Sequence, residues 1–256
     1  MRRSILGLAA MLAAGWIPPG WAQPKWAIGQ TYSGNIDIGG VQMPLPAGEW
    51  TVSGFQASTN LTRTDGTVPG ASMVVTLAQL TGSAVRGYTV FVYNERSMSS
   101  GWNVPDAKTC RRTEIHHAKV IRDVQLSKSC EYVNHIIYTV SATSAQWWKD
   151  TIDFARSRAI VMPPVTIASG IVVSDRANFV SALYHFNPAL KGFPAPNNTV
   201  WASSDWNVMN VAEDERKKAF VQSVIDWTEK SRPAVEAGLA GKLKKGEGLD
   251  WPAAMQ

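Results

Sequence analysis

Four histidines carry the side chains best suited to acid–base or metal chemistry in this chain: His116, His117, His135 and His185. His116 and His117 are adjacent on a predicted strand, so their side chains point to opposite faces and cannot both bind one metal ion without a bulge. Glu114 shares a face with His116, but a zinc site would still lack a third ligand nearby in sequence. His135 and His185 each stand alone on a predicted strand, where a structural, hydrogen-bonded role is the commoner one. We therefore predict no metal site, with a zinc site using some of these histidines as the alternative.

The only two cysteines are Cys110 and Cys130. In an oxidising compartment an isolated pair of this kind usually forms a disulfide. The alternative is a Cys–His nucleophile, because His135 follows Cys130 by five residues. An odd spacing places those two side chains on opposite faces of a strand. The sequence therefore predicts a disulfide between Cys110 and Cys130.

None of the common catalytic or cofactor-binding motifs is present: there is no G-x-S-x-G, no H-E-x-x-H, and no Walker or dinucleotide fingerprint. We predict no catalytic residue and no cofactor. A catalytic triad can still assemble from scattered residues. The alternative is therefore a hydrolase that uses His185 with Asp205 and a nearby serine, either Ser203 or Ser204.

Three tryptophans lie in predicted loops that are rich in polar residues: Trp102, Trp201 and Trp206. An indole offers a flat apolar face and one N–H donor, which suits a sugar ring, a peptide or a partner surface. We predict a ligand-binding set made of these three tryptophans with Asp205 and His185. In the competing interpretation, the rings hold long loops against the core.

The elements that would position these residues are a series of β-hairpins and two helices, and both helices lie in the later part of the chain. Predicted strands follow one another as hairpins through residues 32–140 and again through 165–186, and the second pair is apolar enough to be central in a sheet. Helices are predicted at about 144–159, capped by Thr143 or Ser144, and at about 211–231, capped by Asn210. The second is predicted to end near Pro233, where a separate short helix to Gly238 can start. This order predicts an α+β fold with a largely antiparallel sheet and both helices packed on it.

Residues 23–243 are predicted to form a single domain, with a possible sub-boundary near residue 141. Residues 244–256 are predicted to be a flexible tail, with Trp251 as a possible anchor.

Residues 1–22 have the layout of a bacterial secretory signal peptide. Arg2 and Arg3 precede an uncharged apolar run over 5–16, and Gly20 and Ala22 offer small residues for cleavage. The run is much shorter than the roughly 20 residues of a spanning helix. No later stretch reaches spanning length without charges, so we expect no transmembrane segment in the mature chain and a periplasmic or secreted location.

Removing this leader takes away two of the 25 basic residues and none of the 20 acidic ones, which leaves a net charge of +3. That charge is too small to indicate a nucleic-acid partner. The leading prediction is a non-enzymatic envelope protein that binds an unknown protein or small ligand through loops 95–109 and 195–210. A subunit of an envelope assembly is a further alternative.

Overall fold

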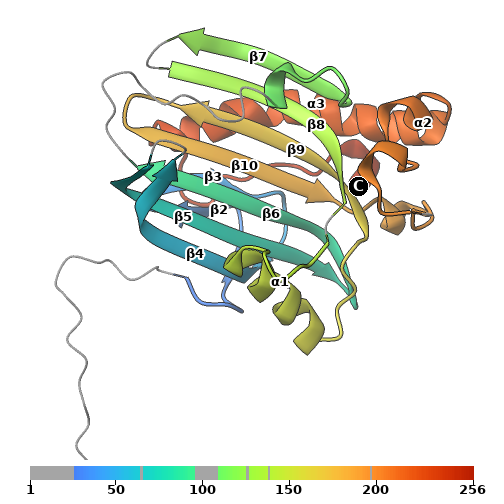
Figure 1. Cartoon of the computed structure of the whole chain (residues 1–256), viewed down its shortest axis with the longest axis horizontal. Coiled ribbons are helices and arrows are strands. Elements are labelled where there is room, and N and C mark those ends of the chain that lie inside the picture. Colours follow the sequence, from blue (N-terminus) through green and yellow to red (C-terminus); the bar gives the residue numbers. More distant parts are fainter. Residues whose placement is uncertain (1–25, 64–65, 96–108, 125–126, 138, 197) are drawn as a thin grey trace, which may run out of the picture.

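A computed structural model describes residues 26–256 with the exception of 64–65, 96–108, 125–126, 138 and 197. Eight strands form one antiparallel sheet in the order β1–β4–β5–β6–β10–β9–β8–β7 (Figure 1). The strands of this sheet are β1 (Thr31–Tyr32), β4 (Trp50–Arg63), β5 (Gly66–Thr81), β6 (Ala84–Glu95), β7 (His117–Val124), β8 (Ser127–Ile137), β9 (Val165–Ser174) and β10 (Asn178–Phe186). A separate hairpin consists of β2 (Asn35–Ile38) and β3 (Val41–Pro44). The predicted α+β class with an antiparallel sheet is confirmed.

The two most apolar strands lie in the interior of the sheet, as predicted. β9 pairs with β8 and β10, and β10 pairs with β6. Every residue of β9 is buried. The pairing of β6 with β10 also joins strands from both sides of residue 141 into one continuous sheet.

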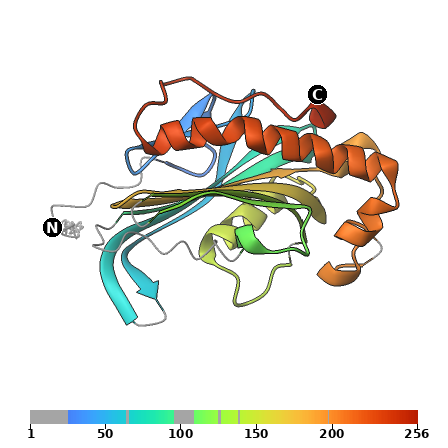
Figure 2. The ribbon, with the colours of Figure 1, turned by 90° about the horizontal axis from the view of Figure 1, so that it is seen from above.

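Helices cover the two faces of the sheet unequally. The long helix α3 (Glu215–Leu239) lies across β8, β9 and β10, and the β2–β3 hairpin packs on the same face (Figure 2). The shorter helix α1 (Gln146–Ser157) lies on the opposite face against β4 and β5. Each face of the sheet therefore has its own set of buried residues, and a side chain's place in the β alternation decides which set it joins.

The first predicted helix is confirmed as α1, but its predicted cap was wrong. Ala145 occupies the N-cap position without a side-chain hydrogen bond. The hydroxyl of Ser144 instead accepts a hydrogen bond from the backbone N–H of Ser141. Serine side chains bond to backbone groups in turns as well as at helix caps. Ser144 bonds within the turn that precedes α1 and therefore does not cap the helix.

The second predicted helix is two helices in the structure, α2 (Val208–Ala212) and α3. The predicted cap, Asn210, was wrong: Asn207 caps α2, and Asp214 caps α3 by accepting from the backbone N–H groups of Arg216 and Lys217. Asn210 lies three residues after one observed cap and four residues before the other, and asparagine and aspartate are equally suitable N-caps in sequence. Only the path of the chain decides which of them caps a helix.

The predicted end of this helix at Pro233 was also wrong, because α3 continues to Leu239. A proline inside a helix removes one backbone hydrogen bond. The following turns offset that loss, since Val235 is fully buried and Gly238 lies so close to β3 that a Cβ there would collide with the carbonyl of Gln42. Tertiary packing therefore stabilises the helix on both sides of Pro233.

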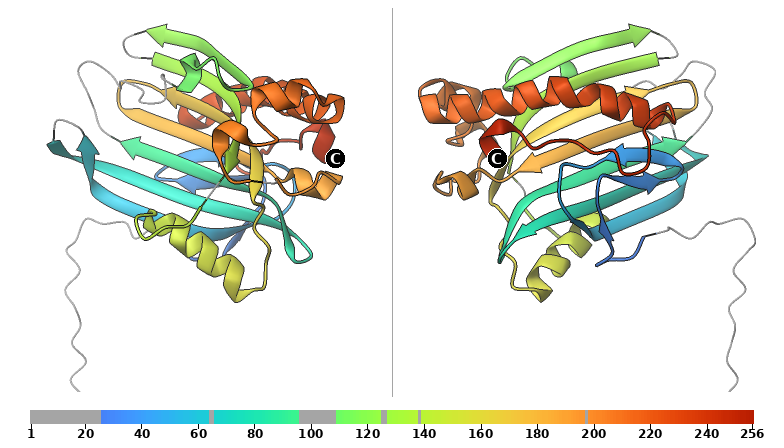
Figure 3. Two further views of the ribbon diagram at one scale, coloured as in Figure 1. Left: turned by 45° about the vertical axis from the view of Figure 1, so that its right-hand side comes forward. Right: turned by 180° about the vertical axis from the view of Figure 1, so that it is seen from behind.

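Residues 244–256, predicted to be a flexible tail, pack against the rest of the fold. Trp251 is buried and stacks on Trp50, with ring centroids 5.7 Å apart and an angle of 13° between the planes. The backbone N–H of Leu249 donates to the carbonyl of Leu45. The C-terminal segment thus returns along α3 and covers the edge of the β2–β3 hairpin (Figure 3).

Cys110 and Cys130 form the predicted disulfide, which links a short 3-10 helix, η2 (Thr109–Arg111), to β8. The bond closes a loop with a sequence separation of 20 residues. Replacing both cysteines by serine should lower the free energy of unfolding by about 3 kcal/mol, because the unfolded chain regains the closed-loop entropy. Urea unfolding measures this loss, and the wild-type protein under reducing conditions is the matched control. An unchanged unfolding midpoint in both samples would contradict the prediction.

None of the helices in the described part of the chain is both long enough and apolar enough to cross a membrane.

Candidate functional site

His185, a member of the predicted ligand set, is fully buried on the α1 side of the sheet. Its ring stacks on Tyr88 at 4.1 Å, and its Nδ1 lies 3.0 Å from the hydroxyl of Thr166. Burial lowers the pKa of His185 to about 3, so the ring is neutral at physiological pH. This enclosure leaves no approach for a substrate.

The other residues of the hydrolase alternative lie in a different layer. The backbone carbonyl of Asp205 accepts from Lys217 of α3, and the hydroxyl of Ser204 is buried and accepts from a backbone N–H. Those contacts belong to the α3 side of the sheet, whereas His185 faces α1. The structure therefore does not assemble His185, Asp205 and a serine into a catalytic group.

The predicted binding tryptophans have different environments. Trp206 is only 1% exposed and packs edge-on against Phe193 and Phe220, so its ring is part of the core. Trp201 is partly buried: one face stacks on His135 at 5.0 Å and the guanidinium of Arg112 lies 5.2 Å from its centroid. Trp102 lies outside the described residues. Of the described tryptophans in the predicted set, only Trp201 has a partly accessible side chain.

Two histidines anchor the connection that carries these tryptophans. The Nε2 of His135 bonds to the carbonyl of Trp201, whose indole N–H donates back to the carbonyl of His135. The Nε2 of His116 bonds to the carbonyl of Trp206 at 2.9 Å. Because a carbonyl only accepts, both Nε2 atoms carry the proton. The long connection is thereby fastened to the β7–β8 edge of the sheet.

Both anchoring histidines are held in the neutral form. Burial, and secondarily the neighbouring His135, lower the pKa of His116 to about 4. Burial also lowers the pKa of His135. Neutral rings suit a role as hydrogen-bond donors to backbone carbonyls rather than as acid–base catalysts at neutral pH.

The connection segment, defined here as residues 187–212, is internally hydrogen-bonded despite its irregular path. Side-chain amides of three asparagines donate to backbone carbonyls within it: Asn198 to Ser203, Asn207 to Ala202, and Asn210 to Ser204. Such bonds substitute for regular secondary structure and order a long loop.

Two large apolar side chains protrude from this ordered segment. Val200 is 59% exposed and Met209 is 73% exposed. Val200 directly precedes the short helix η4 (Trp201–Ser203), and Met209 lies on α2. Side-chain hydrogen bonds of Asn207 and Asn210 link these two helices. The segment therefore presents apolar groups to solvent on a fixed frame.

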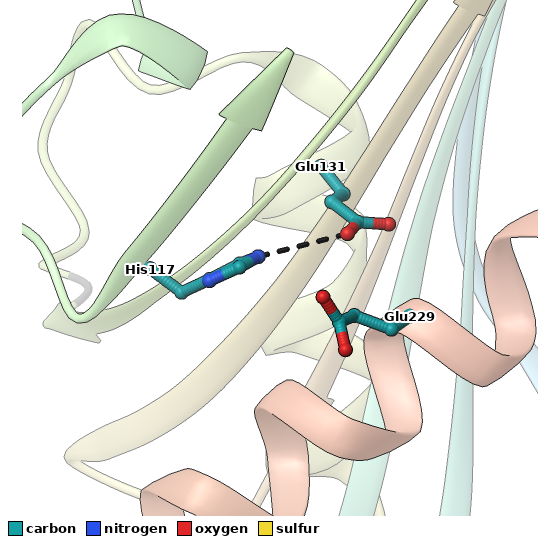
Figure 4. A group of neighbouring side chains, drawn as sticks. All are labelled: His117, Glu131 and Glu229. Carbon is teal, nitrogen blue, oxygen red and sulfur yellow. Dashed lines mark ion pairs between the residues drawn. The ribbon is translucent and has the colours of Figure 1, made fainter. Parts of the chain in front are cut away.

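A second group of chemically capable side chains lies between β7, β8 and α3. His117, Glu131 and Glu229 each offer a ligand-type atom, and these atoms all lie within 4.8 Å of one another (Figure 4). The Nε2 of His117 is 3.6 Å from Oε1 of Glu131. Figure 4 shows the three side chains converging on one point from three different elements.

The strand register explains why His117 and Glu131 meet. Lys119 pairs directly with Glu131, and His117 lies two residues away on the same face, which makes it the diagonal neighbour of Glu131. Glu229 approaches from α3, which crosses this face. Sequence reasoning missed this group because the strand pairing and the approach of a residue about a hundred positions later are both invisible in sequence.

Basic residues complete the surroundings of this group. Arg232 donates to Oε2 of Glu131 at 3.0 Å, and Lys119 donates to Oε1 of Glu229 at 2.9 Å. Arg232 also bonds to Glu236, one turn further along α3. The spacings of three and four between Glu229, Arg232 and Glu236 place them on one face of the helix.

Comparison of the chain with protein-family models, with curated proteins and with solved structures gives no match.

Proposed function

We propose that the protein is an exported, non-enzymatic binding module of the bacterial envelope, and that it docks a protein partner through the connection segment. The leader-like residues 1–22 support export, and a disulfide is compatible with an oxidising compartment. The hydrolase alternative would need an accessible His185, whereas the side chain of His185 is fully buried.

The exposure of Val200 and Met209 on a hydrogen-bonded frame carries this proposal. Docking buries apolar surface and gains free energy from its removal from water. A loop that is already ordered loses little conformational entropy when it binds, so more of that gain appears as affinity. Binding residues are often placed in this way, on loops held by a rigid scaffold.

Replacing both Val200 and Met209 by serine should weaken partner binding by about 10-fold or more, which is the effect of losing modest apolar contacts at an interface. The same change should leave the free energy of unfolding within about 0.5 kcal/mol, because both side chains are exposed. Val161→Ser is the matched control, since Val161 is 65% exposed but lies outside the connection segment.

Site-specific photo-crosslinking in intact cells measures this binding. A photoreactive residue at position 209 should give a discrete adduct in the periplasmic fraction, the same residue at 161 should give none, and Val200→Ser should reduce the yield at 209. Equal adducts at both positions, or an adduct found only in the cytosol, would refute the proposed function. The mass of the adduct also separates a single partner from the neighbouring subunits of an envelope assembly.

A further inference from the structure

We propose that His117, Glu131 and Glu229 form a binding site for a divalent transition-metal ion, with zinc as the best-suited ion. This inference does not depend on the connection segment or on its partner. One imidazole nitrogen and two carboxylate oxygens are a ligand set that zinc accepts, with a fourth position left for water.

Two buried atoms of the group face each other without the hydrogen bond that a direct ion pair would make. Glu131 is only 1% exposed, and its Oε1 has no hydrogen-bond partner in the described part of the chain. The buried Nε2 of His117 is likewise without a hydrogen bond among the described residues. Leaving a buried polar atom unpaired costs about 1–3 kcal/mol. An ion bound between these two atoms would satisfy both and remove that cost.

The separation of these atoms suits coordination better than direct pairing. A nitrogen and an oxygen that share a hydrogen bond lie about 2.7–3.2 Å apart, whereas His117 Nε2 and Glu131 Oε1 are 3.6 Å apart. Two ligands at about 2.1 Å from a tetrahedral ion are separated by about 3.4 Å. Small side-chain movements would therefore bring both atoms to coordination distance of a single ion.

The two basic neighbours act differently on the carboxylate ligands. Arg232 binds Oε2 of Glu131, which leaves Oε1 directed at His117. Hydrogen bonds of this kind orient ligating carboxylates in metal sites. Lys119 has a different role: it bonds to the partly exposed Glu229 from an exposed position of its own, and so it competes with the ion for that ligand.

The exposure of the three side chains increases from Glu131 through His117 to Glu229, which provides a route for the ion. Glu131 is buried, His117 is mostly buried, and Glu229 is exposed on its outer side. An ion can therefore enter past Glu229 and retain a water molecule on that side. Once bound, it would join the β7–β8 edge of the sheet to α3.

Titration of the purified, chelator-treated chain with zinc chloride tests the site directly. Isothermal titration should give one zinc per chain, and zinc at about 100 times its Kd should raise Tm by about 5 °C or more. Glu229→Gln and His117→Gln should each weaken binding by at least about 100-fold, since loss of a ligand should exceed the 10- to 100-fold effect of losing an outer hydrogen bond.

Two further variants make the result specific. Lys119→Gln should tighten zinc binding, because it frees Glu229. Glu215→Gln makes the same charge change as Glu229→Gln, but at the start of α3, and should leave zinc affinity unchanged. Cobalt(II) should give a visible absorption spectrum with the wild-type chain that is lost in His117→Gln.

The proposal is overturned if no zinc binds, or if zinc binds with the same affinity in Glu229→Gln and His117→Gln as in the wild type. The first outcome would leave a structural ion-pair network, and the second would place the ion elsewhere, for instance at His116 and His135. Both ligand variants are expected to fold, because neither replaces Glu131, and circular dichroism checks that expectation.

Discussion

Replacing Trp206 by alanine should lower the free energy of unfolding by about 3–5 kcal/mol, the usual cost of removing a buried large aromatic side chain. The indole is almost completely buried: it packs against Phe193 and Phe220, and the ammonium group of Lys217 lies 5.7 Å from its ring centroid. Its removal would leave a cavity at the junction of the connection segment with α3. Urea denaturation with a two-state fit measures the loss.

Trp201→Ala is the matched control for this prediction. Its ring is partly exposed, with one face stacked on the buried His135 and the guanidinium of Arg112 near its centroid. We expect a clearly smaller loss of stability than for Trp206. If Trp206→Ala instead left the unfolding midpoint unchanged and abolished partner binding, Trp206 would be a ligand-binding residue rather than a core residue.

Acidification from pH 7 to pH 5 should cost about 4 kcal/mol of stability through His185 and His116 alone, because both are buried in the neutral form. The folded-state pKa is about 3 for His185 and about 4 for His116, against 6.5 for an unperturbed histidine. As the pH falls below 6.5, the unfolded chain binds protons that the folded chain does not bind. Each group then costs about 1.4 kcal/mol per pH unit until its folded-state pKa is reached.

This pH window separates the histidines from the carboxylates, whose ordinary pKa values lie near 4. Urea unfolding at half-unit steps between pH 7 and pH 5, with a chelator present, measures the slope. His185→Phe should keep the stacking on Tyr88 and remove about half of the slope that His185 and His116 together contribute. A slope that is the same in His185→Phe and wild type would show that His185 does not resist protonation in the folded state.

Local patterns were enough to predict several elements. The apolar runs at 165–173 and 178–186 indicated central strands, because a strand covered on both faces can be apolar throughout. The spacing of apolar residues predicted α1 and most of α3. The lone cysteine pair predicted the disulfide, since only one pairing was possible.

Tertiary packing decided the features that depend on distant parts of the chain. The continuation of α3 through Pro233 follows from its contact with β3, and the placement of Trp251 follows from its stacking on Trp50. Both contacts join segments roughly two hundred residues apart, so no local pattern contains them.

The candidate site, too, has features that the sequence indicated and features that only the tertiary structure decided. Sequence indicated the connection around Trp201 and Trp206 as a place of interest, because aromatic residues in a long polar loop stand out from their neighbours. It could not tell the core tryptophan from the partly exposed one, since burial depends on α3. The sequence by itself determined the kinds of side chain available, the strand and helix periodicities and the single disulfide. The tertiary structure alone decided that His117, Glu131 and Glu229 face one another, because strand register and helix approach are set by the packing of the whole chain.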